Sequence, residues 1–339
     1  MAQKTYGIDF GTGTIKVYKR GHGIVMLERN VVSTVGSGKK PVAIGEKAFE
    51  MFEKAPPSIS VTFPMKHGVV SETQEMIALW DFLYSKIDKH YKKKAADFYI
   101  AIPADITDVE KQSYNRIVTE GECRPKKVML IDKPIADAYG LGINVEKVSG
   151  LLIVNLGSDT TEVSILSHGG IIVSELLPYG GDYFDNQIIN YIRKEYNFVI
   201  GKKTAEQVKK NLVSAFPTDD KMEFVGRDMV KGLPRTLTIS SSEIHPKTQD
   251  VFETIAGAVQ SMLEHTPPEI SHEIKERGIY LTGGSSWIRG IDRYLADETY
   301  IKVNTTDKAQ ETVIKGLGYL TEHPRLAAKY QRSFGESKD

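Results

Sequence analysis

The sequence predicts an α/β protein made of two related halves, and three observations support this fold class. Predicted strands alternate with predicted helices along most of the chain. Three short strands joined by glycine turns occur at the N-terminus, and the same pattern starts again near residue 151. The 339 residues exceed the length of one ordinary domain. Because solenoid repeats are far shorter than this interval, we interpret the pattern as a duplicated domain.

The composition excludes several classes of protein. Hydrophobic residues make up 40% of the chain, which is too many for a disordered protein. Basic and acidic residues balance at 44 each, so we expect no nucleic-acid partner. No apolar run approaches the roughly 20 residues that span a bilayer, and a strand begins too early for a signal peptide. The single cysteine, Cys123, excludes an intramolecular disulfide, so we expect a cytoplasmic protein.

The first half is predicted to open with three strands within residues 5–28, where apolar residues alternate and glycines supply the turns. A Gly/Pro-rich stretch, 36–68, is interpreted as a small appended subdomain. The elements predicted after it are a helix over 76–87, a strand at 98–102, a helix opened by the capping box of Thr107, a strand at 128–131 and a helix from Pro134.

The second half repeats this order with one insertion. Its three strands are predicted at 151–156, 162–166 and 171–176, and the insertion covers about 181–245. The insertion is expected to hold helices at 182–195 and 204–215 and strands within 222–240. A long helix over 251–262, a strand at 278–281 and a last helix over 308–321 follow, and the charged tail from Arg325 is expected to be frayed.

The two glycine-rich turns are candidate phosphate sites. Each follows a strand and precedes hydroxyl side chains, and such a bend exposes backbone N–H groups that can hold phosphate oxygens. One such turn alone is more often an ordinary hairpin. Two copies are more specific, because a duplicated fold would bring both to one central cleft. The candidate residues are Gly11, Thr12, Gly13 and Thr14 in the first turn, and Gly157, Ser158, Asp159 and Thr160 in the second.

Three further features fit a nucleotide site. Asp9 ends its strand just before the first turn, where a carboxylate suits a hydrated Mg²⁺ ion, although a turn-capping aspartate is the alternative. The run Leu281–Ser286 reads as a strand, a Gly-Gly pair and a helix start, which can meet an anion. Glu206 and Lys209 share one helix face; alone they would be a solvated ion pair, but beside a nucleotide they could grip ribose and base.

These motifs resemble the bacterial actin family, in particular its rod shape-determining MreB/Mbl branch. The matching stretches are Gly7-Ile8-Asp9-Phe10-Gly11-Thr12, Thr160-Thr161-Glu162-Val163, Tyr191-Ile192-Arg193-Lys194, Thr266-Pro267-Pro268-Glu269 and Leu281-Thr282-Gly283-Gly284. The resemblance runs from about residue 5 to 322. It implies an actin-like, ribonuclease-H-like duplicated fold with a central nucleotide cleft.

The resemblance also implies a division into four parts and a tail. The first large domain would comprise 1–32, 68–142 and 311–325, with 33–67 as its small subdomain. The second would comprise 143–180 and 244–310, with 181–243 as its small subdomain, and 326–339 would be a flexible tail.

In functional terms, the resemblance implies ATP with Mg²⁺ and polymerisation into filaments at the inner face of the cell membrane. Such filaments would guide the cell-wall synthesis machinery and so help determine cell shape. The two glycine turns would hold the phosphates, while Lys133 and Thr160 would occupy the positions that activate the attacking water. Ribose, base and adenosine contacts would come from Glu206, Gln207, Val208 and Lys209 and from Gly283, Gly284, Ser285 and Ser286.

The chain departs from the family pattern at the reacting groups. Lys133 stands where the family has a glutamate that orients water, and a lysine of ordinary pKa is protonated at pH 7 and cannot accept a proton. Asn155 replaces an aspartate, which removes one carboxylate from the surroundings of the metal. Asp159 replaces a glycine and adds a carboxylate, so it is a further candidate metal residue. Loss of a general base costs about 10²–10⁴ in rate. We therefore expect at most a slow ATPase, with ordinary turnover through water held by Thr160 as the alternative.

The sequence allows two interpretations of the membrane contact and several alternatives to a filament subunit. The stretch Lys89–Lys94 is basic where the family has an apolar loop; it is either a solvated surface or an electrostatic contact with anionic lipid. The alternatives to a filament subunit are a non-polymerising ATP-binding adaptor and a paralogue that copolymerises with a more active family member. A sugar kinase or chaperone ATPase is less favoured, because we find neither a catalytic aspartate with a sugar pocket nor a substrate-binding domain.

Overall fold

The computed structural model describes residues 3–36 and 41–332, and the chain divides into two compact units. Unit 1 comprises residues 1–148, 166–176 and 310–339, and unit 2 comprises residues 149–165 and 177–309. The stretch 166–176, expected in the second large domain, is grouped with unit 1, where His168 and Gly169 donate backbone hydrogen bonds to Val148 and Val145. None of the helices in the described part has the length and apolar character needed to cross a membrane.

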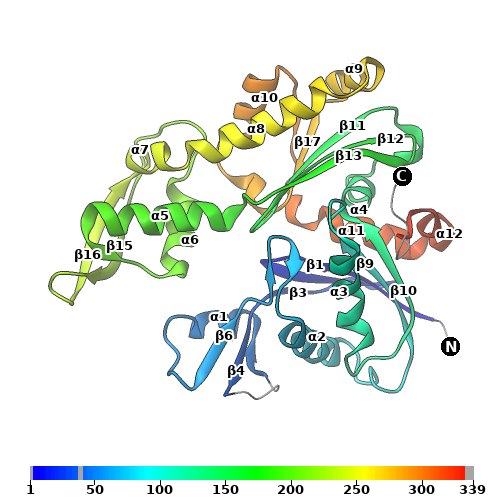
Figure 1. Cartoon of the computed structure of the whole chain (residues 1–339), viewed down its shortest axis with the longest axis horizontal. Helices are drawn as coiled ribbons and strands as arrows, with labels where there is room; N and C mark the ends of the chain where they lie inside the picture. The colour runs from blue at the N-terminus through cyan, green and yellow to red at the C-terminus, as the bar shows by residue number, and fades with distance from the viewer. Residues whose placement is uncertain (1–2, 37–40, 333–339) are drawn as a thin grey trace. The chain divides into compact units, whose positions relative to one another are not determined.

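Unit 1 is built around a five-stranded sheet with the order β10–β9–β1–β2–β3 (Figure 1). The neighbours β10, β9 and β1 run parallel, whereas β1, β2 and β3 form an antiparallel meander. The three strands predicted within residues 5–28 are therefore confirmed. The strand bounds are β1 Lys4–Phe10, β2 Thr14–Lys19, β3 Gly23–Arg29, β9 Ala96–Ile102 and β10 Pro125–Asp132.

Successive side chains of β1 point to opposite faces of the sheet, and a helix packs against each face. Tyr6, Ile8 and Phe10 are buried in a core that includes Trp80 and Tyr84 of α2 (Thr73–Ile87). On the opposite face Gly7 lies so close to Leu317 of α11 (Thr312–Glu322) that a Cβ at residue 7 would come within 2.9 Å of the leucine Cβ. The sheet therefore has a helix on each face. Helix α3 (Asp108–Thr119) begins at the predicted capping box of Thr107 and Glu110.

Helix α4 (Lys133–Gly140) packs against α11 at backbone contact. A Cβ on Gly140 would lie 1.8 Å from the carbonyl oxygen of Thr312, and a Cβ on Gly316 would lie 1.6 Å from that of Ala136. No side chain fits at either position, so the glycines fix the distance between these helices.

Smaller elements complete unit 1. A three-stranded sheet of order β5–β4–β6 begins at Val32, one residue before the predicted small subdomain 33–67 and four before the Gly/Pro-rich stretch 36–68. Ala48 and Phe49 of α1 belong to a separate hydrophobic cluster in this part of the chain. The bounds are β4 Val32–Val35, β5 Pro41–Ile44, α1 Gly45–Met51, β6 Ile59–Thr62, β7 Met65–Lys66, β8 Val69–Val70 and the 3₁₀ turn η1 Val145–Lys147.

The segment after α11 is folded, so the prediction of a frayed tail is wrong for residues 325–332. It forms α12 (Pro324–Ala327) and the 3₁₀ turn η5 (Ala328–Tyr330), and Gln331 then pairs antiparallel with Ile131 at the edge of β10. The Arg332 guanidinium contacts Asp132 at 2.7 Å. The unpaired N–H and C=O groups of an edge strand can pair with another strand, and here a later segment of the same chain pairs with β10. Residues 333–339 lie outside the described part.

The second five-stranded sheet has the order β13–β12–β11–β17–β18, which repeats the order of the first sheet read from β3 to β10. This repetition agrees with the duplication predicted from the sequence. The bounds are β11 Leu151–Leu156, β12 Thr161–Ser167, β13 Gly170–Leu177, β17 Ile279–Thr282 and β18 Val303–Asn304.

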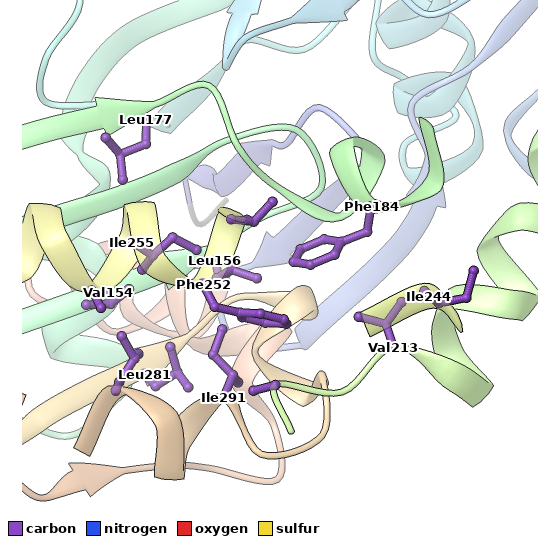
Figure 2. Packing of buried hydrophobic residues seen from close by; sticks show 14 of the residues in the cluster. Val154, Leu156, Leu177, Phe184, Val213, Ile244, Phe252, Ile255, Leu281 and Ile291 are labelled. Carbon is purple, nitrogen blue, oxygen red and sulfur yellow. The ribbon is translucent and has the colours of Figure 1, made fainter. Parts of the chain in front are cut away.

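The core of unit 2 lies between its strands and helices. Figure 2 shows Val154, Leu156 and Leu281 of the strands beside Phe252 and Ile255 of α8. The apolar stripe predicted over 251–262 faces this core, as expected for an amphipathic helix. Helices α9 Pro268–Arg277 and α7 Ser241–Ile244 were not predicted, and the helix expected directly after the Gly-Gly pair begins later, as α10 Ile291–Thr299. The other helices are α5 Gly181–Tyr196, α6 Lys202–Leu212 and α8 Gln249–Glu264.

The insertion carries its own three-stranded sheet, of order β14–β15–β16, and its predicted helices and strands are confirmed with shifted ends. The strand bounds are β14 Phe198–Val199, β15 Lys221–Asp228 and β16 Pro234–Ser240. The remaining 3₁₀ turns are η2 His245–Lys247, η3 Gly284–Trp287 and η4 Ala309–Glu311. The four-part division of the chain stays a prediction.

Candidate functional site

The first glycine turn connects β1 to β2 and is fixed by backbone and side-chain hydrogen bonds. The Gly11 N–H donates to the carbonyl oxygen of Thr14 at 3.1 Å. Asn30 is fully buried and holds the turn from the other side: its amide donates to Gly11 O at 3.0 Å, and its backbone N–H donates to Gly13 O at 3.1 Å. A Cβ on Gly11 would lie 2.7 Å from Thr14 O, so this position requires glycine. Asn30 was missed because nothing in its local sequence marks it.

Asp9 and Lys16 form a buried ion pair beside this turn. The two residues are directly opposite each other on antiparallel β1 and β2, and Lys16 Nζ donates to Asp9 Oδ2 at 2.8 Å. Only 4% of Asp9 and 7% of Lys16 is exposed. The second oxygen, Oδ1, is buried and has no hydrogen-bond partner within the described residues. Lys16 was not among the predicted site residues, although a lysine seven residues after the aspartate falls at the mirror position of the hairpin.

Lys133 lies near Asp9 because of the strand register. Asp9 pairs with Ala101 of β9, Ala101 pairs with Ile131 of β10, and Lys133 follows two residues later as the first residue of α4. Burial alone would raise the pKa of Asp9, but the ammonium groups of Lys16 and Lys133 outweigh burial and hold that pKa below its usual value. Lys133 itself is half-buried and, among residues 3–36 and 41–332, forms no hydrogen bond or ion pair.

In unit 2, the second glycine turn meets two other segments. The Gly157 N–H donates to Thr160 O at 2.9 Å, which repeats the closure of the first turn. Gly157 O accepts from the Gly181 N–H at 3.1 Å and from the Ser285 hydroxyl at 2.7 Å. The predicted residues of the second turn and of the Gly-Gly segment are therefore brought together. The pair Gly180-Gly181, which opens α5, belongs to the same group and was missed, although a Gly-Gly before a helix is a visible signal.

The Cα of Gly181 is the point where these segments converge. A Cβ built there would lie 2.6 Å from Ser285 Oγ, 3.2 Å from Lys209 Nζ and 3.5 Å from Ser158 O. An ammonium, a hydroxyl and a carbonyl oxygen of the turn thus surround one glycine. Because Ser285 donates to Gly157 O and Lys209 donates to Asp185 and Gly181 O, these contacts fix the second glycine turn, the start of α5 and α6 relative to one another.

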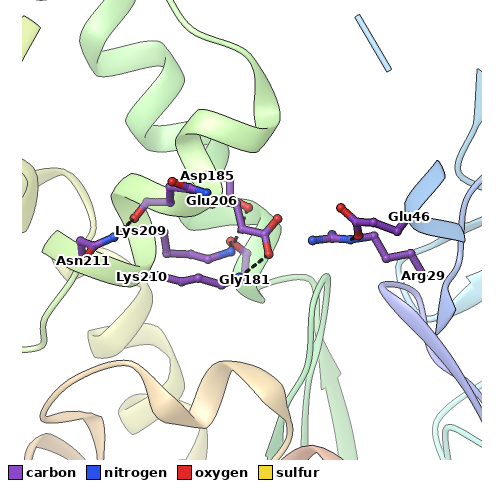
Figure 3. A network of polar contacts seen from close by, with 9 residues as sticks. Arg29, Glu46, Gly181, Asp185, Glu206, Lys209, Lys210 and Asn211 are labelled. Carbon is purple, nitrogen blue, oxygen red and sulfur yellow. Dashed lines mark hydrogen bonds and ion pairs between the residues drawn. The ribbon is translucent and has the colours of Figure 1, made fainter. Parts of the chain in front are cut away.

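Lys209 is held in place by unit 2 itself. Its ammonium donates to Asp185 Oδ2 at 2.8 Å and to Gly181 O at 3.0 Å, as the dashed lines in Figure 3 show. Desolvation raises the pKa of the buried Asp185 carboxyl to about 6, and the neighbouring Lys209 opposes this shift. The i,i+3 pair of the sequence analysis is not formed, because Glu206 pairs with Lys210 at 2.7 Å instead.

The remaining predicted residues of α6 differ in exposure. Val208 is fully buried in the core of unit 2, on the same helix stripe as Ala205 and Leu212. Its side chain therefore cannot contact a ligand. Gln207 is exposed. The run Gly283–Ser286 also differs from expectation: residues 284–287 form a 3₁₀ turn, and the α-helix begins only at Ile291. The expected helix N-terminus is therefore absent at the Gly-Gly pair, whereas Gly283 adopts a positive φ of 85°.

A pocket of about 460 Å³ in unit 1 contains none of the predicted site residues. It lies between the start of α3 and strand β13, with Asp108, Lys111, Ile172, Val173 and Arg332 among its lining residues. Lys111 pairs with Asp108 and Arg332 pairs with Asp132, so these charges are already compensated. We assign no ligand to this pocket.

The residues around Asp9 do not fit the predicted magnesium ion. Asp9 supplies one carboxylate, of which one oxygen binds Lys16 and the other is buried. Two ammonium groups share its field, whereas a magnesium site normally gathers acidic and phosphate oxygens. Of the other two predicted metal residues, both in unit 2, Asn155 offers an amide and Asp159 a carboxylate. In the described part of the chain no group of three or more His, Cys, Asp or Glu residues could hold a metal ion.

Comparisons with known proteins extend over nearly the whole chain. The family model described as MreB/Mbl protein matches residues 3–329. The cell shape-determining protein Mbl of Bacillus cereus is 34% identical over 325 residues, which cover 95% of this chain and 97% of that protein. The crystal structure of Spiroplasma citri MreB5 bound to AMPPNP is 30% identical, with a TM-score of 0.90 over 97% of this chain and 99% of that one, and the ADP-bound structure gives the same values. A MamK double helical filament shares the fold, with a TM-score of 0.80 at 19% identity over 95% and 99% of the two chains.

Proposed function

Because the chain belongs to the MreB/Mbl protein family, we propose that it is an ATP-binding cytoskeletal subunit that polymerises into filaments and helps to determine cell shape. The actin-like α/β fold predicted from the sequence is confirmed. The match over residues 3–329 carries the proposal, since it leaves no segment for a separate kinase pocket or chaperone domain within that range. The nucleotide-bound MreB5 structures support nucleotide binding.

In this proposal the glycine turns bind the phosphates through their backbone N–H groups. Thr12 and Thr14 add hydroxyl donors in unit 1, and Ser158 and Thr160 add them in unit 2. The cluster at Gly181 supports this role, because the hydrogen bonds from the Ser285 hydroxyl and the Gly181 N–H to Gly157 O fix the shape of the second turn. The magnesium predicted from the sequence is not carried into the proposal, since the surroundings of Asp9 do not fit it.

We propose that hydrolysis is slow or absent. A half-buried ammonium beside Asp9 cannot accept a proton from water, and Lys133 stands at the position of the family's water-orienting residue. Purified protein should release phosphate about 10²–10⁴-fold more slowly than a Lys133→Glu variant that recovers the general base. Equal rates would show that Thr160 and water suffice.

Filament formation and membrane association complete the proposal. Sedimentation with ATP, followed by negative-stain microscopy, separates a polymerising subunit from a non-polymerising adaptor. The adaptor is the second candidate, because Lys133 replaces the family's water-orienting glutamate and an adaptor does not require hydrolysis. If only mixtures with a more active family member pellet, the chain is a copolymerising paralogue. We propose a cytoplasmic location at the inner membrane surface, with the basic stretch Lys89–Lys94 as the contact, and the cell-wall synthesis machinery as a partner.

A further inference from the structure

We propose that Lys16 and Lys133 take the place of the divalent cation, so that this chain binds its nucleotide as the metal-free polyphosphate. The inference rests on the proposed nucleotide binding and specifies the cation requirement of that site.

The first step is the charge at the end of β1. Asp9 contributes one negative charge, and Lys16 and Lys133 contribute two positive charges within its field. The group as a whole therefore carries one net positive charge. A divalent cation approaching it is repelled, whereas a polyphosphate is attracted. Burial of the Asp9–Lys16 pair keeps water from screening this charge.

The second step is the division of work between the two lysines. Lys16 is committed to Asp9 by the 2.8 Å contact and by the cross-strand register, so its main effect is to neutralise that carboxylate. Lys133 is half-buried at the start of α4 and forms no hydrogen bond or ion pair within the described residues. Its three donors remain for an incoming anion. The Lys133 ammonium is thus the group that binds phosphate oxygens where other sites use a metal.

The third step is the rigidity of the helix that carries Lys133. Gly140 and Gly316 bring α4 and α11 into backbone contact, and Arg332 holds Asp132, the residue just before Lys133. The backbone of Lys133 is therefore fixed relative to β1, which keeps its ammonium within reach of the first glycine turn. A fixed backbone reduces the entropy that is lost when the ammonium binds an anion.

The test is calorimetric titration of the full chain with ATP and with its non-hydrolysable analogue AMPPNP, in excess magnesium and in excess EDTA. For the unmodified protein we expect dissociation constants that differ by less than about threefold between the two conditions. Loss of about tenfold or more of the affinity in EDTA would overturn the inference. No binding in either condition would instead refute the proposed nucleotide binding, so the two failures are distinguishable.

The variant Lys133→Glu reverses the charge beside Asp9 and should make binding metal-dependent, with about tenfold or greater loss in EDTA relative to magnesium. The matched control is Lys127→Glu, an exposed lysine earlier on β10 with the same change of charge, which should behave like the unmodified chain. Thermal melting of each variant confirms that it is folded. A Lys133→Glu protein that is folded and still binds equally well in EDTA would refute the role of Lys133.

Discussion

The hydroxyl of Ser285 donates a 2.7 Å hydrogen bond to the carbonyl oxygen of Gly157, 128 residues earlier in the chain. Through this contact the Gly-Gly segment after β17 is attached directly to the second glycine turn. The same carbonyl oxygen also accepts from the Gly181 N–H. Two separate segments of unit 2 therefore donate to one oxygen of the second glycine turn.

Ser285→Ala should weaken both stability and nucleotide binding. Removing the hydroxyl costs about 1 kcal/mol of unfolding free energy, and the freed turn should lower ATP affinity about three- to tenfold. Urea denaturation and calorimetric titration measure the two effects. The control is Ser261→Ala on the exposed face of α8, which should alter neither. Unchanged ATP affinity in Ser285→Ala would separate this hydrogen bond from the binding site.

Gly316→Ala should destabilise unit 1 severely. The new Cβ would lie 1.6 Å from the carbonyl oxygen of Ala136, and only separation of α4 from α11 relieves that overlap. We expect a loss of about 3 kcal/mol or more, or failure to fold. Gly257→Ala is the matched control, because a Cβ in that helix meets nothing within 4 Å and should stabilise by about 1 kcal/mol. Chemical denaturation curves that coincide for the two variants would contradict this account.

Asp185 should make the stability of the protein depend on pH. Desolvation raises the pKa of its carboxyl from 3.8 to about 6 in the folded chain. In that interval the folded state binds more protons than the unfolded state, so the free energy of unfolding falls as pH rises from about 4 to about 6. In Asp185→Asn this decrease should be smaller by on the order of 2–3 kcal/mol. Urea denaturation of both proteins at a series of pH values measures the difference, and parallel profiles would exclude the raised pKa.

Arg332→Ala should release the segment that follows α11. The guanidinium contacts both carboxylate oxygens of the buried Asp132, at 2.8 and 2.7 Å, and its loss should cost about 1–3 kcal/mol. Hydrogen exchange of the Arg332 and Gln331 backbone should accelerate together with the fall in stability. Arg325→Ala, an exposed arginine of α12, serves as the control and should change stability by less than about 0.5 kcal/mol.

Charge reversal of Lys93 and Lys94 should weaken binding to anionic vesicles. Both side chains are exposed. At about 1 kcal/mol per lysine, the double change to glutamate should weaken sedimentation with vesicles about tenfold or more. The Lys126→Glu/Lys127→Glu protein has the same net charge and should still sediment. Binding that persists at high salt would rule out an electrostatic contact.

Periodicity predicted most of the strands and the long helices, because their patterns are local. The β1–β2–β3 meander, the capping box at Thr107 and the stripe of α8 each carry a signal within one element. Helix α9 was missed because it buries only Ile274, which is too little for a visible stripe. The start of α10 was predicted too early, because only Ile291 and Leu295 of that helix are buried and mark its bounds weakly. The folded end of the chain was missed because its contacts, such as Tyr330 with Tyr139, join distant segments.

The candidate site was predictable where glycines mark a turn and less so where side chains complete it. Both turns close as expected, at Gly11 and at Gly157. Asn30, Lys16 and Gly181 were missed, since their roles depend on strand pairing and on packing of separate segments. The pairing of Lys209 with Asp185, rather than with Glu206, likewise follows from how α5 packs against α6.

The position of α11 has a consequence for biosynthesis. Its residues 312–322 cover one face of β1 and contact α4 without intervening side chains. This face of the N-terminal sheet therefore stays exposed until residue 322 has been synthesised, which happens only after all of unit 2. Nascent chains halted before that point should be sensitive to proteases in residues 4–29 and should be recognised by chaperones that bind exposed apolar strands.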